Sequence, residues 1–347
     1  MPAMNHDLAT RALELVSIPS VSHHEDELAE YVAAAMPGPP VFEDGLSSVY
    51  AQRTGRPLVL FAGHLDTVPA QDNLPGTLED GWVVGLGASD MKGGLAVMIE
   101  LARWAADAET AYDLAFLFFP REEVGYEWNP LPGLFADCRL LSEAELAVLL
   151  EPTDDAIQAG CMGTLVARRV FTGKSAHAAR PWLGENAILR AAEAIHAFEP
   201  LEVDIEGLRF VEVLSPTMIA GGIADNVIPD RVTVDYNFRF SPLRSEADAL
   251  ERARELIGEF DVVSLSPAGR VSLHNPHVER LRAAGGFPVE SKQAWTNVAD
   301  FTSRGVDAVN LGPGATRYAH TREERVEVAA MERLFEALQR FLRADSV

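Results

Sequence analysis

Hydrophobic residues in the first half of the chain form short continuous runs, separated by segments of helical periodicity. Residues 57–62, 114–120 and 146–150 are almost entirely apolar, which is typical of short strands buried on both faces. Between the first two runs, apolar residues recur three and four positions apart and predict a helix over residues 92–108. This alternation predicts an α/β fold with a mixed, largely parallel sheet sandwiched by helices.

The hydrophobic pattern changes after Gly163. Residues 164–172 and 231–240 alternate apolar and polar side chains, which predicts antiparallel strands with one face in water. Residues 186–198 and 245–260 have the periodicity of helices. We therefore expect this middle part to be an α+β domain with the order β-α-β-β-α, in which helices cover one side of a small sheet.

The hydrophobic pattern of the first half of the chain returns at about Val271. A helix is expected at residues 276–284, a buried strand at 308–311 and a closing amphipathic helix at 329–343. The sequence thus predicts a discontinuous main domain that is interrupted by an inserted one. The main domain comprises residues 1–163 and 271–347, and the inserted domain comprises residues 164–270.

The composition limits the partners that the protein can have. The chain of 347 residues is 48% hydrophobic and long enough for two domains. It carries 29 Lys and Arg against 52 Asp and Glu, a formal net charge of −23, so we expect neither nucleic acid nor a membrane as a partner. No apolar run approaches the roughly 20 residues that span a bilayer. The acidic excess keeps the protein soluble, and some of its carboxylates could also gather a divalent metal.

Two further features bear on the compartment. The N-terminal stretch MPAMNHDLATRALELVS has the pattern of a short amphipathic helix and not of a secretory signal. Cys138 and Cys161 could form one disulfide, but nothing in the sequence requires it. A reduced, cytoplasmic location is the simpler expectation.

Five short motifs place metal-binding residue types near the ends of predicted strands. They are GHLDTVP with His64 and Asp66, GASDMKGG with Asp90, PREEVG with Glu122 and Glu123, LLEPT with Glu151, and GATRYAHTREE with His320. Open α/β sheets have their functional crevice at the carboxyl ends of strands. Imidazole and carboxylate ligands suit zinc, and a carboxylate can bridge two ions. Asp90, in a glycine-rich turn, is the best candidate for such a bridge.

Each motif alone has a simpler explanation. A single histidine after a strand is more often a hydrogen-bonded loop residue, and Asp90 could be the N-cap of the following helix. Glu122 and Glu123 could form a solvated turn. The stretch GLGASD also resembles a dinucleotide-binding loop, but no adequate strand precedes it and no acidic residue follows about 20 positions later. The five motifs together favour a two-metal site.

These motifs, in this order, resemble the di-zinc aminoacylase and carboxypeptidase family of metallopeptidases, and the likeness covers nearly the whole chain. The resemblance implies a metal-dependent amidohydrolase that acts on linear amides and holds two zinc ions, which cobalt or manganese can replace. It implies that His64 and Glu151 bind one ion, that Glu123 and His320 bind the other, and that Asp90 bridges them.

The resemblance also implies roles for other residues. Glu122 would be the general base, and Asp66 would orient His64. The inserted domain would be a lid and the dimerisation domain of a homodimer. His177, in GKSAHAARP, would reach into the active site of the partner subunit, although without the resemblance it would be read as a surface histidine.

Longer stretches such as SAHAARPWLGENAI and GGIADNVIPD resemble one branch of the family more closely. That branch cleaves N-succinyl-LL-2,6-diaminopimelate to succinate and LL-2,6-diaminopimelate in lysine biosynthesis. A small anionic N-acyl amino acid needs cationic and polar side chains for its recognition. The candidates in this sequence are Asn226, Arg239, Arg180, Thr296 and Gly314.

Some positions depart from the pattern of the family. Arg121 stands where an acidic residue is frequent, and Leu86 stands where arginine is common. Arginines that precede the lid in another branch are absent near Cys161, and Arg180 could take their place. The alternatives are therefore a sister deacylase for acetylornithine or acyl-lysine, or a dipeptidase. A non-catalytic binding protein of the same fold would have lost ligands, whereas all the expected positions are filled here.

Overall fold

The computed structural model describes residues 8–343, and the chain divides into two compact units. The first unit comprises Met1–Gly160, Ser272–Glu290 and Asp300–Val347, and the second comprises Cys161–Val271 and Ser291–Ala299. The predicted division had assigned 291–299 to the main domain. In the structure this segment groups with the second unit, where Ser291 and Gln293 donate side-chain hydrogen bonds to the carbonyl of Arg209. In the predicted N-terminal helix, residues 1–7 lie outside the described residues, and α1 spans Leu8–Ser17.

The first unit is built on an eight-stranded sheet with the order β1-β2-β6-β3-β7-β17-β8-β16. Its centre is parallel and consists of β3 (Leu58–His64), β6 (Asp113–Phe119), β7 (Leu146–Leu149) and β17 (Ala308–Asn310). All residues of β3 and β6 are buried, as their continuous apolar runs predict. The outer strands are β1 (Phe42–Asp44), β2 (Ser47–Gln52), β8 (Ile157–Ala159) and β16 (Val289–Ser291).

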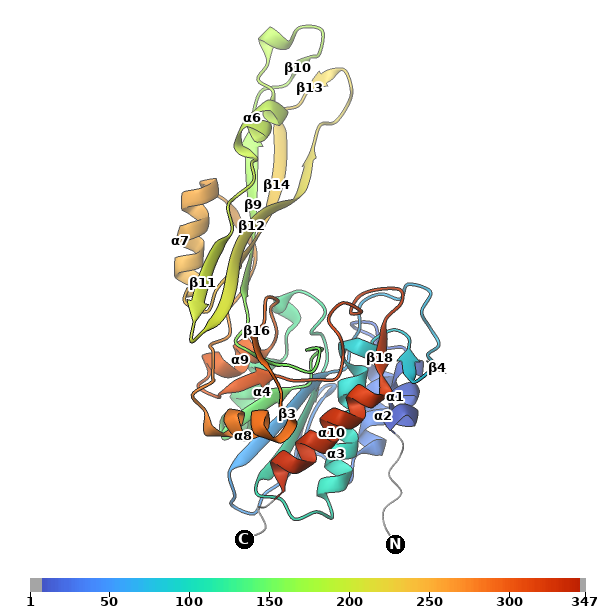
Figure 1. Ribbon diagram of the computed structural model, residues 1–347. Helices are drawn as coiled ribbons and strands as arrows, with labels where there is room; N and C mark the ends of the chain where they lie inside the picture. Colours follow the sequence, from blue (N-terminus) through green and yellow to red (C-terminus); the bar gives the residue numbers. More distant parts are fainter. Residues whose placement is uncertain (1–7, 344–347) are drawn as a thin grey trace. The chain divides into compact units, whose positions relative to one another are not determined.

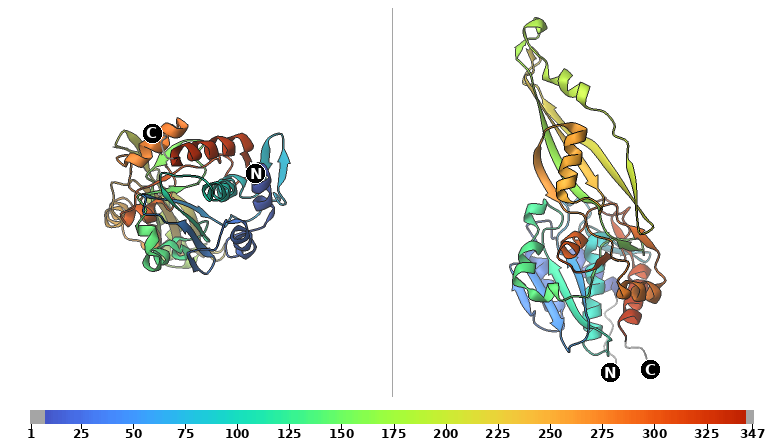
Figure 2. Two further views of the ribbon diagram at one scale, coloured as in Figure 1. Left: turned by 90° about the horizontal axis from the view of Figure 1, so that it is seen from below. Right: turned by 90° about the vertical axis from the view of Figure 1, so that its left-hand side faces the viewer.

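Helices cover both faces of this sheet. α3 (Gly93–Ala105) connects β3 to β6, and α4 (Leu131–Asp137) connects β6 to β7, in the opposite direction along the sheet. Because such crossovers are right-handed, the two helices lie on opposite faces. α1 and α10 (Val328–Leu342) pack with α3, whereas α9 (Val298–Ser303) packs on α4 (Figures 1 and 2). The predicted fold class is therefore confirmed.

The remaining elements of the first unit are short or lie at its edges. A small three-stranded sheet has the order β18-β5-β4, and its central strand β5 leads into the Asp90 turn. Its strands are β4 (Thr77–Glu79), β5 (Trp82–Val84) and β18 (Arg325–Glu327). The other helices are α2 (Asp26–Ala35), α5 (Arg139–Ser142), α8 (Pro276–Gly285) and the short turns η1 (Ala88–Lys92) and η2 (Tyr126–Trp128).

The second unit contains a five-stranded antiparallel sheet with the order β11-β12-β14-β9-β15. Helices α6 and α7 contribute alanine and isoleucine side chains to the same core as this sheet. The predicted order has one strand, without assigned residues, between its first helix and residues 231–240, whereas the structure has β11, β12 and β13 there. The second half of the 14-residue strand β12 is exposed and lacks the alternation expected of a strand. The elements are β9 (Gly163–Thr172), β10 (Ala176–His177), η3 (Pro181–Leu183), α6 (Ala187–Ala194), β11 (Leu201–Ile205), β12 (Leu208–Gly221), β13 (Val227–Ile228), β14 (Arg231–Phe240), α7 (Glu246–Ile257) and β15 (Asp261–Ser266).

Two observations concern the expectations about compartment. Cys138 and Cys161 are both buried and not joined to each other. None of the described helices combines the length and the apolar character that crossing a membrane requires.

Candidate metal centre

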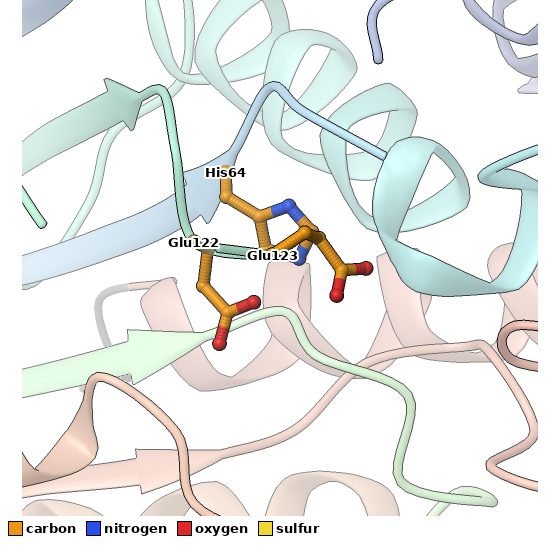
Figure 3. Close-up of side chains that lie close together, drawn as sticks. All are labelled: His64, Glu122 and Glu123. Carbon is orange, nitrogen blue, oxygen red and sulfur yellow. The ribbon is translucent and has the colours of Figure 1, made fainter. Parts of the chain in front are cut away.

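Three parallel strands bring polar side chains to one edge of the main sheet. In the register of the sheet, His64 of β3 lies opposite Phe119 of β6, and Ala62 of β3 lies opposite Leu149 of β7. The segments that follow β6 and β7 carry the Glu122–Glu123 pair and Glu151. Figure 3 shows the side chains of His64, Glu122 and Glu123 close together at these strand ends.

The Asp90 turn reaches the same edge from the start of α3. Gly94, in the first turn of that helix, packs directly on the end of β7, where an added Cβ would lie only 2.3 Å from the carbonyl oxygen of Leu150. Gly87 has a φ of 77°, which a residue with a side chain rarely adopts. Asp90 is not an N-cap, because α3 begins after Lys92 and has no side-chain capping bond. The N-cap interpretation is therefore wrong.

The two oxygens of Asp90 face two different histidines. Oδ1 lies 3.2 Å from His64 Nε2, and Oδ2 lies 3.5 Å from His320 Nε2. His64 Nε2 is also 3.9 Å from Glu151 Oε1, and His320 Nε2 is 2.9 Å from Glu123 Oε1. Two groups of three residues result, and in each the potential ligand atoms lie within 4.8 Å of one another. Asp90 belongs to both groups, as a bridging carboxylate would.

Asp66 fixes the backbone that carries the glutamate pair. Its carboxylate accepts hydrogen bonds from the N–H groups of Glu122 (2.9 Å) and Glu123 (3.0 Å) and from Ser22 Oγ (2.7 Å). His64 Nδ1 lies 3.0 Å from the backbone carbonyl of Asp66 and 3.6 Å from its carboxylate. Asp66 therefore contacts His64 and also the backbone of the glutamate pair. The sequence predicted only its role in orienting His64.

The site concentrates negative charge in a partly buried place. Burial raises the pKa of Glu122 well above its usual range, and the carboxylates of Glu151, Glu123 and Asp90 act in the same direction. Hydrogen bonds to Asp90 and Glu123 raise the pKa of His320 to about 11. The carboxylates therefore attract positive charge strongly, and a metal ion bound there competes with protons. The idea that Glu122 and Glu123 form a solvated turn is wrong.

The set of donors fits a pair of divalent cations. It combines two imidazoles with three carboxylates, one of which faces both histidines. Mixed nitrogen and oxygen ligands of this kind suit ions such as zinc. A third group, formed by His64, Glu122 and Glu123, also has its donor atoms within 4.8 Å. Glu122 could therefore serve either as a ligand or as a free carboxylate beside the ions.

The second unit contains five further residues that the sequence singled out. His177 and Arg180 are exposed, and the N–H of Ala179 donates to His177 Nδ1, which leaves the proton of a neutral ring on Nε2. Asn226 is exposed, and its carbonyl accepts a hydrogen bond from the N–H of Ala178. Arg239 donates to Thr164 Oγ1 at 2.6 Å, and burial lowers its pKa. Thr296 is almost completely buried.

In the first unit, Gly314 and Glu324 both contact the Asp90 turn. Gly314 packs against the Asp90 turn, since an added Cβ would lie 2.2 Å from the carbonyl oxygen of Ser89. Glu324, which the sequence analysis did not single out, is buried and accepts hydrogen bonds from the backbone of the same turn. Glu324 lies in the same sequence motif as His320, but so does the exposed Glu323, and the sequence does not distinguish the two glutamates.

Carboxylates and imidazoles that converge at the strand ends of a mixed α/β sheet are typical of metal-dependent hydrolases. The sequence model described as Peptidase family M20/M25/M40 matches residues 60–344. The chain belongs to this family.

Two curated relatives agree with this assignment. A Mycobacterium tuberculosis protein, provisionally named as a succinyl-diaminopimelate desuccinylase, is 38% identical over 94% of this chain and 96% of its own length. The succinyl-diaminopimelate desuccinylase of Corynebacterium glutamicum is 35% identical over 94% of each chain.

Among solved structures, the aminopeptidase PepT from Bacillus cereus has a TM-score of 0.76 at 23% identity and covers 97% of this chain and 98% of its own. The YXEP protein of Bacillus subtilis, described as a dinuclear metal-binding peptidase of the M20 family, has a TM-score of 0.71 at 16% identity over 98% of each chain. At such identities these two structures support the fold alone.

Proposed function

We propose that this protein hydrolyses N-succinyl-LL-2,6-diaminopimelate to succinate and LL-2,6-diaminopimelate. The observation that carries the proposal is the pair of three-residue groups that share Asp90. The substrate is taken from the relatives at 35–38% identity, which are named for this reaction and match 94% of the chain. The proposed location remains the cytoplasm.

In the proposed site, two zinc ions are held by His64, Glu151, Asp90, Glu123 and His320, with Asp90 shared. The chemistry that such a pair supplies is the lowering of the pKa of water from 15.7 to about 7 and the polarisation of the amide carbonyl. The ions are named as zinc because the ligand set mixes imidazole and carboxylate groups, and cobalt or manganese could replace them.

Glu122 is the proposed general base. Its carboxylate takes a proton from the attacking water as the C–O bond forms, and it returns that proton to the leaving nitrogen as the C–N bond breaks. Glu122 suits this role because its carboxylate stands outside the two groups that share Asp90 and can carry a proton beside them. The N–H groups of Glu122 and Glu123 are both fixed by Asp66, which holds the base in place.

The proposed contacts to the substrate come mainly from the second unit. Arg239 has no carboxylate partner among the described residues, so its guanidinium can pair with a carboxylate of the substrate. Asn226 and Arg180 are exposed and can offer further donors. Thr296 Oγ1 has no hydrogen-bond partner within the described part of the chain. Gly314 is proposed to act through its backbone.

A panel of substrates tests the proposed reaction. Purified protein is analysed for metal content and assayed with N-succinyl-LL-2,6-diaminopimelate, N-acetylornithine, an acyl-lysine and dipeptides. We expect two metal ions per chain, fastest turnover of the succinyl substrate and loss of turnover after chelation that zinc restores. Fast turnover of another substrate beside none of the succinyl compound would identify a sister deacylase or a dipeptidase. No turnover of any substrate would favour a binding protein.

We further propose that the protein is a homodimer that associates through the second unit. The half of β12 from Val213 to Gly221 pairs with β14, and β11 pairs only with Leu208–Glu212 of β12. This leaves one edge of β12 open among the described residues, and Met218 and Ile219 on it are more than 60% exposed. An open edge with exposed apolar side chains favours pairing with a second copy. His177 would then act in the partner's site, where its Nε2–H can donate to a developing oxyanion.

Substitution on this open edge tests the dimer. We expect Ile219→Glu to convert the dimer to a monomer in light scattering, because a two-fold interface places the two new charges near each other. If His177 acts across the interface, turnover should fall together with the dimer fraction. Val263→Glu is the matched control, since Val263 is an exposed apolar residue on β15 at the other edge of the same sheet. A wild-type monomer with full activity would contradict the proposal.

A further inference from the structure

Glu324 binds the turn that carries Asp90. Glu324 is almost completely buried, with 1% of the residue exposed. Oε2 accepts a hydrogen bond from the N–H of Gly87 at 2.8 Å, while Oε1 accepts from the N–H groups of Ser89 at 3.2 Å and Asp90 at 3.0 Å. One carboxylate therefore satisfies three backbone donors of the turn.

The backbone delivers Glu324 to this position. Strand β18 begins at the next residue, and its Arg325 pairs with Val84 of β5. The pairing continues by one residue, because the N–H of Gly85 donates to the carbonyl of Glu324 at 2.9 Å. Glu324 thus lies opposite the residue at which the chain leaves β5 and enters the Asp90 turn. Its place relative to the turn is fixed by the ladder and does not depend on its side chain alone.

Burial raises the pKa of Glu324 to about 7, and two features of its surroundings oppose this shift. The first is the set of three N–H dipoles, which solvate a carboxylate in place of water. The second is Lys92, which is also buried and whose charge acts favourably on Glu324. Lys92 Nζ is anchored by the carbonyl of Ile18 at 2.6 Å. Lys92 and Glu324 are thus both buried next to the Asp90 turn.

The loop that carries Glu324 also carries His320. The two residues are four positions apart, and the N–H of Glu324 donates to the carbonyl of Thr321 between them. His320 Nε2 lies 3.5 Å from Asp90 Oδ2. A single loop therefore supplies one imidazole of the candidate centre and holds the backbone of the carboxylate that this imidazole faces.

We propose that Glu324 is a positioning residue of the metal centre, which orients Asp90 so that one oxygen faces His64 and the other faces His320. This inference rests on the proposed function, in which Asp90 bridges two ions. Removing the carboxylate would release three N–H groups and let the turn rotate. The Asp90 carboxylate would then no longer face both histidines, although no metal ligand had been replaced.

Metal titration of the apoprotein tests this role without relying on activity. Glu324→Gln keeps the size of the side chain but replaces one acceptor oxygen with an NH₂ group, which cannot accept from a backbone N–H. We expect the affinity for at least one of the two ions to fall about 10–100-fold, as is typical when partners of metal ligands are removed. In the cobalt-loaded variant, the visible absorption bands should also shift, because they depend on ligand geometry.

Glu323→Gln is the matched control, because Glu323 is exposed on the same loop and the substitution replaces the same chemical group. Its metal affinity and cobalt spectrum should equal those of the wild type. If Glu324→Gln does not fold, Glu324→Asp takes its place, since it keeps the charge but is one methylene too short to reach the turn.

The outcomes separate this inference from the proposed function. A wild-type protein that binds no ion pair overturns both. A wild type that binds two ions, beside a Glu324 variant with unchanged affinities and spectrum, overturns the positioning role alone. A variant with a lower melting temperature but unchanged metal binding likewise overturns it, because Glu324 would then only stabilise the fold. Weaker binding together with a shifted spectrum supports it.

Discussion

Glu122→Gln is expected to abolish nearly all turnover while the protein keeps both metal ions. The amide has almost the shape of the carboxylate but cannot take up a proton at neutral pH, so transfer from water to the leaving nitrogen is lost. Such general base catalysis is typically worth about 10²–10⁴ in rate. Steady-state kinetics and metal analysis of the same preparation measure the two parts of this prediction.

Metal content decides between the two roles that the geometry of Glu122 permits. Glu122 forms one group of potential ligands with His64 and Glu123, but it stands outside the two groups that share Asp90. If Glu122→Gln loses an ion, Glu122 is a ligand and another residue must be the base. Full activity of the variant would remove Glu122 from the reaction. Glu127→Gln serves as the control, because Glu127 is exposed in the segment that follows the pair.

The sequence predicts the buried part of the fold well, because burial leaves a periodic signal. The continuous apolar runs at 57–62 and 114–120 correspond to β3 and β6, whose residues are all buried. The helix expected at 92–108 is α3, which begins one residue later. Since parallel strands end at one edge of the sheet, the sequence also indicates that the motifs after these strands lie together.

The exposed parts of the fold leave no such signal. The second half of β12 is exposed on both faces, so its hydrophobic pattern does not alternate. The predicted order contains a strand in this region, but the pattern did not give its residues. The helix expected at 186–198 is shorter, because the chain becomes extended at Ile195. In both places, pairing and chain direction are set by neighbours distant in sequence.

Hydrogen bonds to the backbone are equally invisible in the sequence. Asp66 and Glu324 each bind N–H groups of segments that lie far away in the chain. A backbone N–H belongs to every residue except proline, so no residue type marks the partner. The motifs therefore indicate candidate ligands and a candidate base, but they do not indicate that Asp66 and Glu324 hold the loops of these residues.

Asp66→Asn is expected to weaken metal binding and to lower the free energy of unfolding. Only one oxygen of the new side chain can accept, whereas the carboxylate serves the N–H groups of Glu122 and Glu123 together with Ser22 Oγ. A buried donor that loses its acceptor costs about 1–3 kcal/mol. Loss of the partner of a metal-binding segment typically lowers affinity about 10–100-fold. Chemical denaturation of the apoprotein and calorimetric metal titration measure the two effects.

A comparison of substitutions separates geometry from charge at Asp66. Asp66→Ala leaves both N–H groups without an acceptor, so it should destabilise the apoprotein more than Asp66→Asn does. Asp107→Asn removes an equal charge from an exposed position and should change neither quantity. If Asp66→Asn bound both ions like the wild type, Asp66 would not control the ligands. Because its carboxylate holds the base and the Glu123 segment at once, kcat should fall even when added metal refills the site.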